Sequence, residues 1–166
     1  MADIHIRQAQ REDAALIHRY IVDLAIYEKA EHEVESNVAD IERSLFDEPR
    51  SSKALICEVD GKPVGFAVYF ASYSTWLGHH GIYLEDLFVS PEYRGLGAGK
   101  RLLQAVARIA VEEGCRRMEW SVLDWNEPAI NVYEAIGAQA QSEWIRYRLA
   151  GDALIAFAAQ DAGVPA

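Results

Sequence analysis

The alternation of apolar and polar residues along the chain predicts which segments form strands and which form helices. Residues 3–9 alternate with a period of two, which is typical of a half-buried strand. From Arg11 the apolar positions recur at helical spacing as far as Tyr27, which predicts an amphipathic helix of roughly five turns. A shorter helix is expected after Asn37 and ends before Pro49, because the residue before a proline disfavours helical geometry.

The middle of the chain returns to a period of two. Two alternating segments flank Asp60-Gly61, a dipeptide typical of a tight β-hairpin. A further strand is predicted over residues 81–90 and ends at Pro91. Residues 97–113 carry an apolar stripe at helical spacing, and Gly114 is placed to end that helix.

The last third of the chain repeats the strand and helix pattern. Residues 116–125 predict a strand, and residues 126–128 (Asn-Glu-Pro) predict the start of a helix that Gly137 closes. Residues 138–151 alternate again and predict a last strand, followed by a short alanine-rich helix. We expect a frayed tail over residues 162–166. The order of elements predicts an α/β fold, with a mixed, mostly antiparallel central sheet flanked by helices on both faces.

Composition narrows the choice of class and partner. A chain of 166 residues is expected to form a single domain. Its formal net charge of −10 disfavours nucleic acid and anionic membranes as partners, and it suits small cationic amines. The same acid excess is also explained by solubility alone. We find no signal peptide and no apolar run long enough to span a bilayer, so we expect a cytoplasmic protein in which Cys57 and Cys115 are buried, reduced thiols.

A glycine-rich segment lies between a predicted strand and a predicted helix: Arg94-Gly95-Leu96-Gly97-Ala98-Gly99. Glycine lets backbone amides approach a ligand closely, and a helix N-terminus adds partial positive charge, so the segment predicts a phosphate or pyrophosphate site. Lys100 adds a positive charge. The spacing differs from that of a P-loop, where Ser or Thr would replace Arg101, and from the dinucleotide fingerprint, whose third glycine would replace Lys100.

This Arg-x-x-Gly-x-Gly motif, placed between a strand and a helix, resembles the acetyl-coenzyme A motif of the GNAT superfamily of N-acetyltransferases. Three stretches are similar to its diamine (spermidine/spermine) and thialysine acetyltransferase subfamily: YSTW at 73–76, YLEDLFVSPEYRGLGAGK at 83–100 and VLDWNEPAINVY at 122–133. The resemblance runs from about Ile4 to Leu149. It implies transfer of acetyl from acetyl-CoA to a primary amine by direct attack in a ternary complex, without a metal, in a homodimer.

The resemblance implies a cofactor site made of three parts. The backbone of Leu87, Phe88 and Val89 pairs with the pantetheine arm like an added strand. The segment from Arg94 to Lys100 holds the pyrophosphate. Asn126 contacts the pantetheine, and Tyr133 lies at the cofactor sulfur, where it protonates the departing thiolate. By residue type alone, Asn126 is a helix cap and Tyr133 is a core residue at helical spacing.

The resemblance assigns the proton acceptor to Glu85, acting directly or through a water. Strand parity places Leu84 and Asp86 on the face opposite Glu85, so that one of the two acids lies on a covered face. Asp86 is the candidate for binding the amine. A bulge in this strand would invalidate the parity argument.

Further positions match the substrate-contacting residues of the subfamily, although each of them taken alone is explained by structure: Tyr27, Glu28, Trp76, Glu119 and Ser121. Polyamine enzymes carry an acid where this chain has Ser74-Thr75, which favours a lysine-like or short aminoalkyl substrate over a polyamine. Trp144 is a candidate for reaching the partner subunit's site.

Three functions remain to be compared. The first is acetylation of a small amine, the second is acetylation of a protein amine or an aminoglycoside, and the third is a non-catalytic CoA-binding module. The presence of both Glu85 and Tyr133 favours an enzyme over a binder. Cys115 has no evident histidine or aspartate partner for a covalent route, and His79-His80 needs distant residues to hold a metal, so neither is expected to act.

Overall fold

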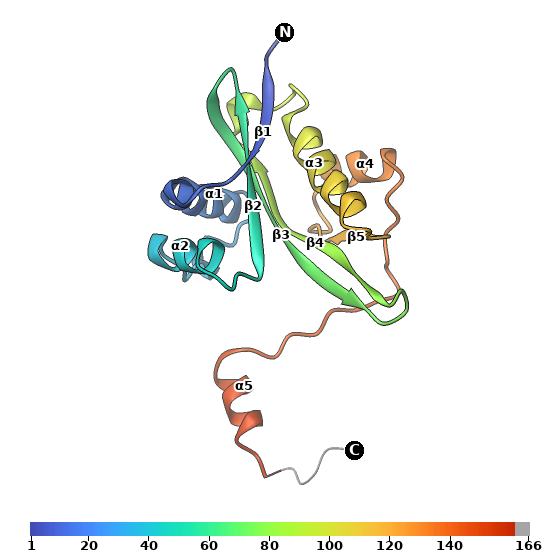
Figure 1. Cartoon of the computed structure of the whole chain (residues 1–166). Helices are drawn as coiled ribbons and strands as arrows, with labels where there is room; N and C mark the ends of the chain where they lie inside the picture. Colours follow the sequence, from blue (N-terminus) through green and yellow to red (C-terminus); the bar gives the residue numbers. More distant parts are fainter. Residues whose placement is uncertain (162–166) are drawn as a thin grey trace. The chain divides into compact units, whose positions relative to one another are not determined.

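The computed structural model describes residues 1–161, and the chain divides into two compact units, Met1–Leu123 and Asp124–Ala166 (Figure 1). Each unit is described by itself. The predicted frayed tail, residues 162–166, lies outside the described residues.

The first unit is built on a five-stranded sheet whose strands follow one another in sequence order (Figure 1). The strands are β1 (Ile4–Gln8), β2 (Ser52–Val59), β3 (Lys62–Ser74), β4 (His79–Val89) and β5 (Met118–Trp120). Neighbouring strands pair antiparallel except β4 and β5, which are parallel. The predicted hairpin is confirmed, since Asp60 and Gly61 connect β2 and β3 with φ of 50° and 80°, as a two-residue turn of primed type requires.

Helices cover both faces of this sheet, which confirms the predicted fold class (Figure 1). On one face lie α1 (Ala14–Tyr27), which follows a short 3-10 turn at Arg11–Asp13, and α2 (Val38–Phe46). On the other face lies α3 (Ala98–Glu112), and two further 3-10 turns connect elements at Glu31–Glu33 and Pro91–Tyr93. The α1 and α2 face buries an aromatic group in which Tyr20 stacks on Phe66 at 5.6 Å and lies 6.0 Å from Phe88.

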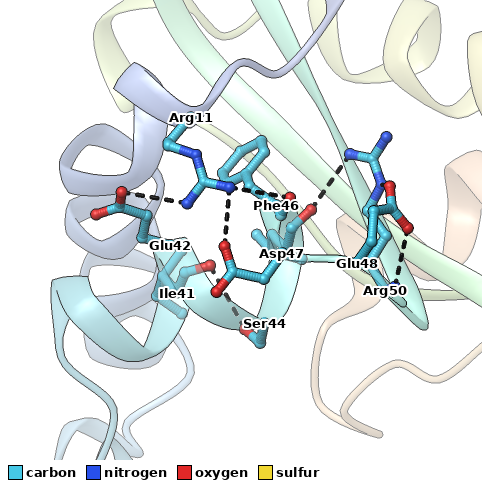
Figure 2. A network of polar contacts seen from close by, with 9 residues as sticks. Arg11, Ile41, Glu42, Ser44, Phe46, Asp47, Glu48 and Arg50 are labelled. Atoms are coloured by element: carbon cyan, nitrogen blue, oxygen red, sulfur yellow. Dashed lines mark hydrogen bonds and ion pairs between the residues drawn. The ribbon is translucent and has the colours of Figure 1, made fainter.

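A surface network joins the start of the first helical segment to the end of α2 (Figure 2). Asn37 caps α2, because its side chain accepts from the Asp40 amide at 2.9 Å. Arg11 then reaches Glu42 at 3.3 Å and Asp47 at 2.8 Å, and it donates to the Phe46 carbonyl at 3.1 Å. These groups are partly exposed, so the ion pairs orient the two segments more than they stabilise them.

The C-terminus of α3 turns back sharply through Gly114, as predicted. Gly114 has φ of 77°, and its amide donates to Val111 O at 3.1 Å. The next amide, that of Cys115, donates to Ala110 O at 2.8 Å. This pair of bonds is a Schellman motif, in which glycine is favoured because the left-handed conformation carries no Cβ penalty.

The second unit contains α4 (Glu127–Ala135) and α5 (Gly151–Ala158). The helix start is where the sequence predicts it, with Asn126 at the N-cap position and a proline in the first turn, although the Asn126 side chain makes no capping bond. Gly137, with φ of 94°, closes α4.

The strand predicted over residues 138–151 is wrong, since residues 138–150 contain no strand and Gly151 opens α5. β5 is also shorter than the predicted 116–125. The alternating pattern shows that a segment can present an apolar face, but a strand also requires a neighbouring edge for its hydrogen bonds. In this chain Ile145 is 76% exposed and Tyr147 is 91% exposed.

The structure tests two expectations drawn from composition. Cys57 and Cys115 are both free and buried, as predicted. In the described part of the chain, helices are too short or too polar to cross a membrane.

Candidate functional site

A bulge in β4 places the two adjacent acids. Asp86 stands opposite Val68 of β3, whereas Leu84 stands opposite Tyr69, so Glu85 has no opposite residue. In such a bulge two residues of one strand oppose one residue of the other, and the alternation of side chains shifts by one position.

The bulge corrects the parity argument. Leu84 and Asp86 are two residues apart, but the register shift puts them on opposite faces of the sheet. Asp86 shares the face of Val68 and Phe88, which belong to the core under α1 and α2. Tyr83 lies on that same face, with its ring centre 5.2 Å from that of Phe70. Glu85 follows Tyr83 by two residues and therefore shares its face. Both acids are therefore directed to the α1 side, with Glu85 exposed and Asp86 partly covered.

A third acid joins them from the end of α1. Burial, with added repulsion from Glu85 and Glu28, raises the pKa of Asp86 to about 7. Burial also raises the pKa of Glu28, which caps α1 at its C-terminus. We call Glu28, Glu85 and Asp86 the acid group. Their mutual repulsion favours the entry of a cation or the uptake of a proton.

The glycine loop, residues 94–99, leads from β4 into α3. Gly95 and Gly97 have φ of 84° and 86°, and an added Cβ at either would meet no protein atom within 4 Å. The first helical hydrogen bond of α3 is donated by the Arg101 amide to Gly97 O at 3.0 Å. The amides of Ala98, Gly99 and Lys100 therefore have no acceptor within the helix, and they form the positive end of its dipole. This loop has the geometry of an anion site.

The outer edge of β4 is open next to this loop. Among the described residues, β5 pairs with β4 only from Ile82 to Leu84. Beyond that point, residues 87–89 pair with β3 on one side alone. The side chains of Phe88 and Val89 are buried in the core, so a ligand added at this edge would contact backbone groups, as an extra strand does.

Arg94 links the loop to the end of α1. Its guanidinium lies 5.0 Å from the centre of the Tyr27 ring and 5.7 Å from that of Phe88. Its Nε donates to Val89 O at 3.1 Å. The structure thus brings together Tyr27 and Arg94, which the sequence analysis assigned to substrate and cofactor respectively.

Sequence reasoning missed Tyr83. Its hydroxyl lies 2.7 Å from Ser121 Oγ, and its backbone stands opposite Glu119 across the β4–β5 pair. Glu119 also lies 3.4 Å from Arg117. Tyr83, Glu119 and Ser121 consequently form one wall beside Glu85, and the spacing of Tyr83 two residues before Glu85 is the signal that would have found it.

Trp76 lies elsewhere. It is 82% exposed in the turn between β3 and β4. A strand rises about 3.3 Å per residue, so the path from His79 to Glu85 covers about 20 Å. Within one chain the structure does not bring Trp76 to the acid group. Asn126 and Tyr133 belong to the second unit, at the start and in the body of α4, and Tyr133 is partly buried there.

The expectation that Cys115 has no histidine partner is wrong. One ligand atom from each of His79, His80 and Cys115 lies within 4.8 Å of the others. The tertiary fold supplies this neighbour, because the turn at Gly114 returns the chain to the start of β4.

The sequence matches the Acetyltransferase (GNAT) family over residues 11–138. This match crosses the boundary between the two units. Thialysine N-epsilon-acetyltransferase of Bos taurus is 39% identical over 165 residues, covering 93% of this chain and 96% of the relative. L-ornithine N5-acetyltransferase of Arabidopsis thaliana is 42% identical over 123 residues, covering 74% of this chain and 51% of the relative.

A solved structure is also similar to this chain. An aminoglycoside N-acetyltransferase in complex with CoA is similar to this chain with a TM-score of 0.70 and 25% sequence identity. That similarity covers 89% of this chain and 95% of the solved one.

Proposed function

Since the chain belongs to the Acetyltransferase (GNAT) family and is an acetyl-CoA-dependent N-acetyltransferase, we propose that its acceptor is a small lysine-like amine. The relatives are named for thialysine and L-ornithine, which both carry a primary amine on a short aliphatic chain. Ser74-Thr75 stands where polyamine enzymes carry an acid, which favours an amino-acid-like amine over a polyamine.

The observation that carries this proposal is the acid group beside the glycine loop. Burial, with added repulsion from Glu85 and Glu28, raises the pKa of Asp86 to about 7, so these three carboxyl groups lie close enough to repel one another. A cationic amine entering between them relieves this repulsion, and the interaction is strong because Asp86 is partly removed from water. Tyr83, Glu119 and Ser121 form the adjoining wall.

The cofactor is proposed to bind along the open edge of β4 and the glycine loop. Backbone groups of Leu87, Phe88 and Val89 pair with the pantetheine arm, and the amides from Gly95 to Lys100 hold the pyrophosphate. Arg94 closes one side of the loop from its place over Tyr27. Asn126 is proposed as a further pantetheine ligand.

In the reaction, the amine must first lose a proton. A lysine-like ammonium has a pKa of about 10.4, so forming the neutral amine at pH 7 costs roughly 4.6 kcal/mol. We assign this proton to Glu85, directly or through a water, while ionised Asp86 orients the ammonium form. The amine nitrogen then bonds to the thioester carbonyl carbon and the carbon–sulfur bond breaks. Tyr133 gives its hydroxyl proton to the departing thiolate, and the second proton of the acylated nitrogen restores the tyrosine hydroxyl.

We further propose a cytoplasmic homodimer that binds neither nucleic acid nor membrane. The net charge of −10 disfavours both polyanionic partners. Exposed apolar side chains in the second unit support a partner subunit: Trp144, Ile145, Tyr147 and Leu149. Trp144 is proposed to reach the partner subunit's site.

A panel of acceptors tests the substrate class. Initial rates with acetyl-CoA should be compared for thialysine, lysine, L-ornithine, spermidine, an aminoglycoside and a peptide with a free N-terminus. We expect the highest kcat/KM for the first three. A preference for the aminoglycoside or the peptide would establish the alternative acceptors, and absence of transfer to every amine would contradict the enzymatic function.

The role of Tyr133 is tested by Tyr133→Phe, which removes only the hydroxyl. We expect kcat to fall by on the order of 10²- to 10⁴-fold with CoA affinity nearly unchanged, because a general acid contributes to the rate and not to binding. Tyr73→Phe is a matched control, since that tyrosine is 68% exposed and belongs to none of the proposed sites. Unchanged turnover in Tyr133→Phe would remove this residue from the mechanism.

A further inference from the structure

A cluster of potential metal ligands lies at the end of β4 away from the glycine loop. His79 and His80 begin β4, and Glu113 and Cys115 flank the turn after α3. We call these four residues the His-Cys cluster. One ligand atom from each of His79, His80 and Cys115 lies within 4.8 Å of the other two. We propose that the cluster binds a zinc ion, a site independent of the amine substrate and contrary to the sequence expectation of no metal.

The backbone brings the cysteine to the histidines. The Schellman turn at Gly114 reverses the chain immediately before Cys115, which is buried. An added Cβ at Gly114 would lie 3.8 Å from His79 Nε2. This nitrogen therefore faces the turn at close range, with only a glycine between it and the end of α3.

The two imidazole rings lie on the same side of β4 although they belong to neighbouring residues of that strand. Adjacent strand residues normally point to opposite faces, but these rings stack with centroids 4.5 Å apart and planes at 21°. They follow Gly78, which has φ of 66°. The stacking of the rings and the closeness of a ligand atom from each to Cys115 place both imidazoles on the same side.

A hydrogen bond determines which ring nitrogen of His79 keeps its lone pair. Its Nδ1 lies 2.7 Å from the His80 backbone carbonyl. A carbonyl oxygen only accepts, so Nδ1 must carry the proton and Nε2 keeps its lone pair. This is how the outer hydrogen bond of a metal-binding histidine fixes its tautomer.

Glu113 supports the second histidine. Its Oε1 lies 3.0 Å from His80 Nε2. A carboxylate bonded to one imidazole nitrogen raises the basicity of the other, as in the carboxylate–histidine pairs behind zinc. The negative end of the α3 dipole lies at the same place and favours a cation.

The donor set selects zinc over hard cations. A thiolate with two imidazoles suits Zn²⁺, whereas Ca²⁺ and Mg²⁺ require oxygen ligands. Zinc bonds of about 2.0–2.3 Å place tetrahedral ligand atoms about 3.3–3.7 Å apart. Separations of up to 4.8 Å must therefore close by at most about 1.5 Å, which side-chain rotation in partly exposed histidines permits. The fourth position is left for water.

The site would join two segments distant in sequence. Arg116 already donates to the Leu77 carbonyl at 2.6 Å and so fastens the turn between β3 and β4 to the chain after α3. A zinc ion held by His79, His80 and Cys115 connects the same two segments. Metal binding is therefore expected to stabilise the folded chain.

The test uses untagged, chelator-treated protein titrated with Zn²⁺ against a chromophoric chelator. We expect one equivalent to bind and the Tm to rise. Co²⁺ should give the near-ultraviolet absorption of a thiolate–cobalt bond. In Cys115→Ser this band should vanish and zinc affinity should fall at least ~100-fold, and Glu113→Gln should lower the affinity by about 10-fold.

His32→Gln and Cys57→Ser are the matched controls, because neither residue belongs to the cluster. His79→Gln provides a second cluster variant if Cys115→Ser fails to fold. Absence of zinc uptake by the unaltered protein would overturn the proposal. So would uptake that His79→Gln and Cys115→Ser leave unchanged, since the ion would then bind elsewhere.

Discussion

β4 and α3 meet twice, once where Val89 leads through the glycine loop into Ala98, and once where Cys115 returns to His79 at the start of β4. At the first meeting the polar groups are backbone amides at a helix N-terminus, which favour an anion. At the second they are imidazole, thiol and carboxyl side chains at a helix C-terminus, which favour a cation.

The difference lies in what each end demands of the sequence. Backbone amides are available in every residue, so the glycine loop needs only small residues in one continuous segment. The His-Cys cluster needs particular side chains from residues 79–80 and 113–115, which only the tertiary fold brings together. The first kind of site is visible as a motif, and the second is not.

Within this comparison, the largest effect is expected at the glycine loop, where the binding groups are backbone amides. Gly97→Val adds a branched side chain in the open space beside the loop amides, at a position with φ of 86°. Each amide–phosphate bond is worth roughly 1.5–3 kcal/mol, so we expect CoA affinity to fall by about 10²-fold. Calorimetric titration with CoA measures it.

Gly61→Val is the control for backbone strain, because Gly61 has φ of 80° and an equally open surrounding. Both variants should lose comparable stability, on the order of 1–2 kcal/mol. If Gly61→Val lost CoA affinity to the same extent, the effect at Gly97 would be strain and not the anion site.

A smaller effect concerns Asp86, which lies in β4 between the two ends. Its folded pKa of about 7 lies above the ordinary value of 3.8, so the folded state holds the proton more tightly than the unfolded state does. The resulting loss of stability grows as the pH rises from about 4 and is complete above about 7. Asp86→Asn should therefore gain stability relative to the unaltered protein, by about 2 kcal/mol more at pH 8 than at pH 5.

Urea unfolding at both pH values measures this difference. Glu85→Gln serves as the comparison, since it removes one repelling charge and leaves Asp86 in place. It should show a weaker pH-dependent gain of the same sign. A stability difference independent of pH in Asp86→Asn would show that Asp86 does not titrate near 7.

The smallest effect tests the turn that builds the second end. Gly114→Ala should cost about 1 kcal/mol of unfolding free energy, because alanine is strained at φ of 77°. α1 ends in the same motif with Lys29 at φ of 60°. Lys29→Gly should consequently be neutral or gain up to about 1 kcal/mol. Equal losses in both variants would contradict this account of the two turns.

The local sequence pattern predicted most of the strands and helices correctly. Asp60-Gly61 predicted its hairpin and Gly114 its helix end, because the conformational preferences of single residues decide both. Pattern failed at Glu85 and Asp86, since strand parity assumes regular pairing and the bulge depends on how β3 packs against β4. It failed again at residues 138–151, where alternation describes a face but does not provide a partner strand.

By itself, the sequence determined the α/β class, the glycine loop and the pair of adjacent acids, because each is written in neighbouring residues. Only the tertiary structure decided that Asp86 is covered while Glu85 is exposed, that Glu28 and Tyr83 stand beside them, and that Cys115 meets His79. Burial and charge repulsion act between groups close in space, and distance along the chain does not report that closeness.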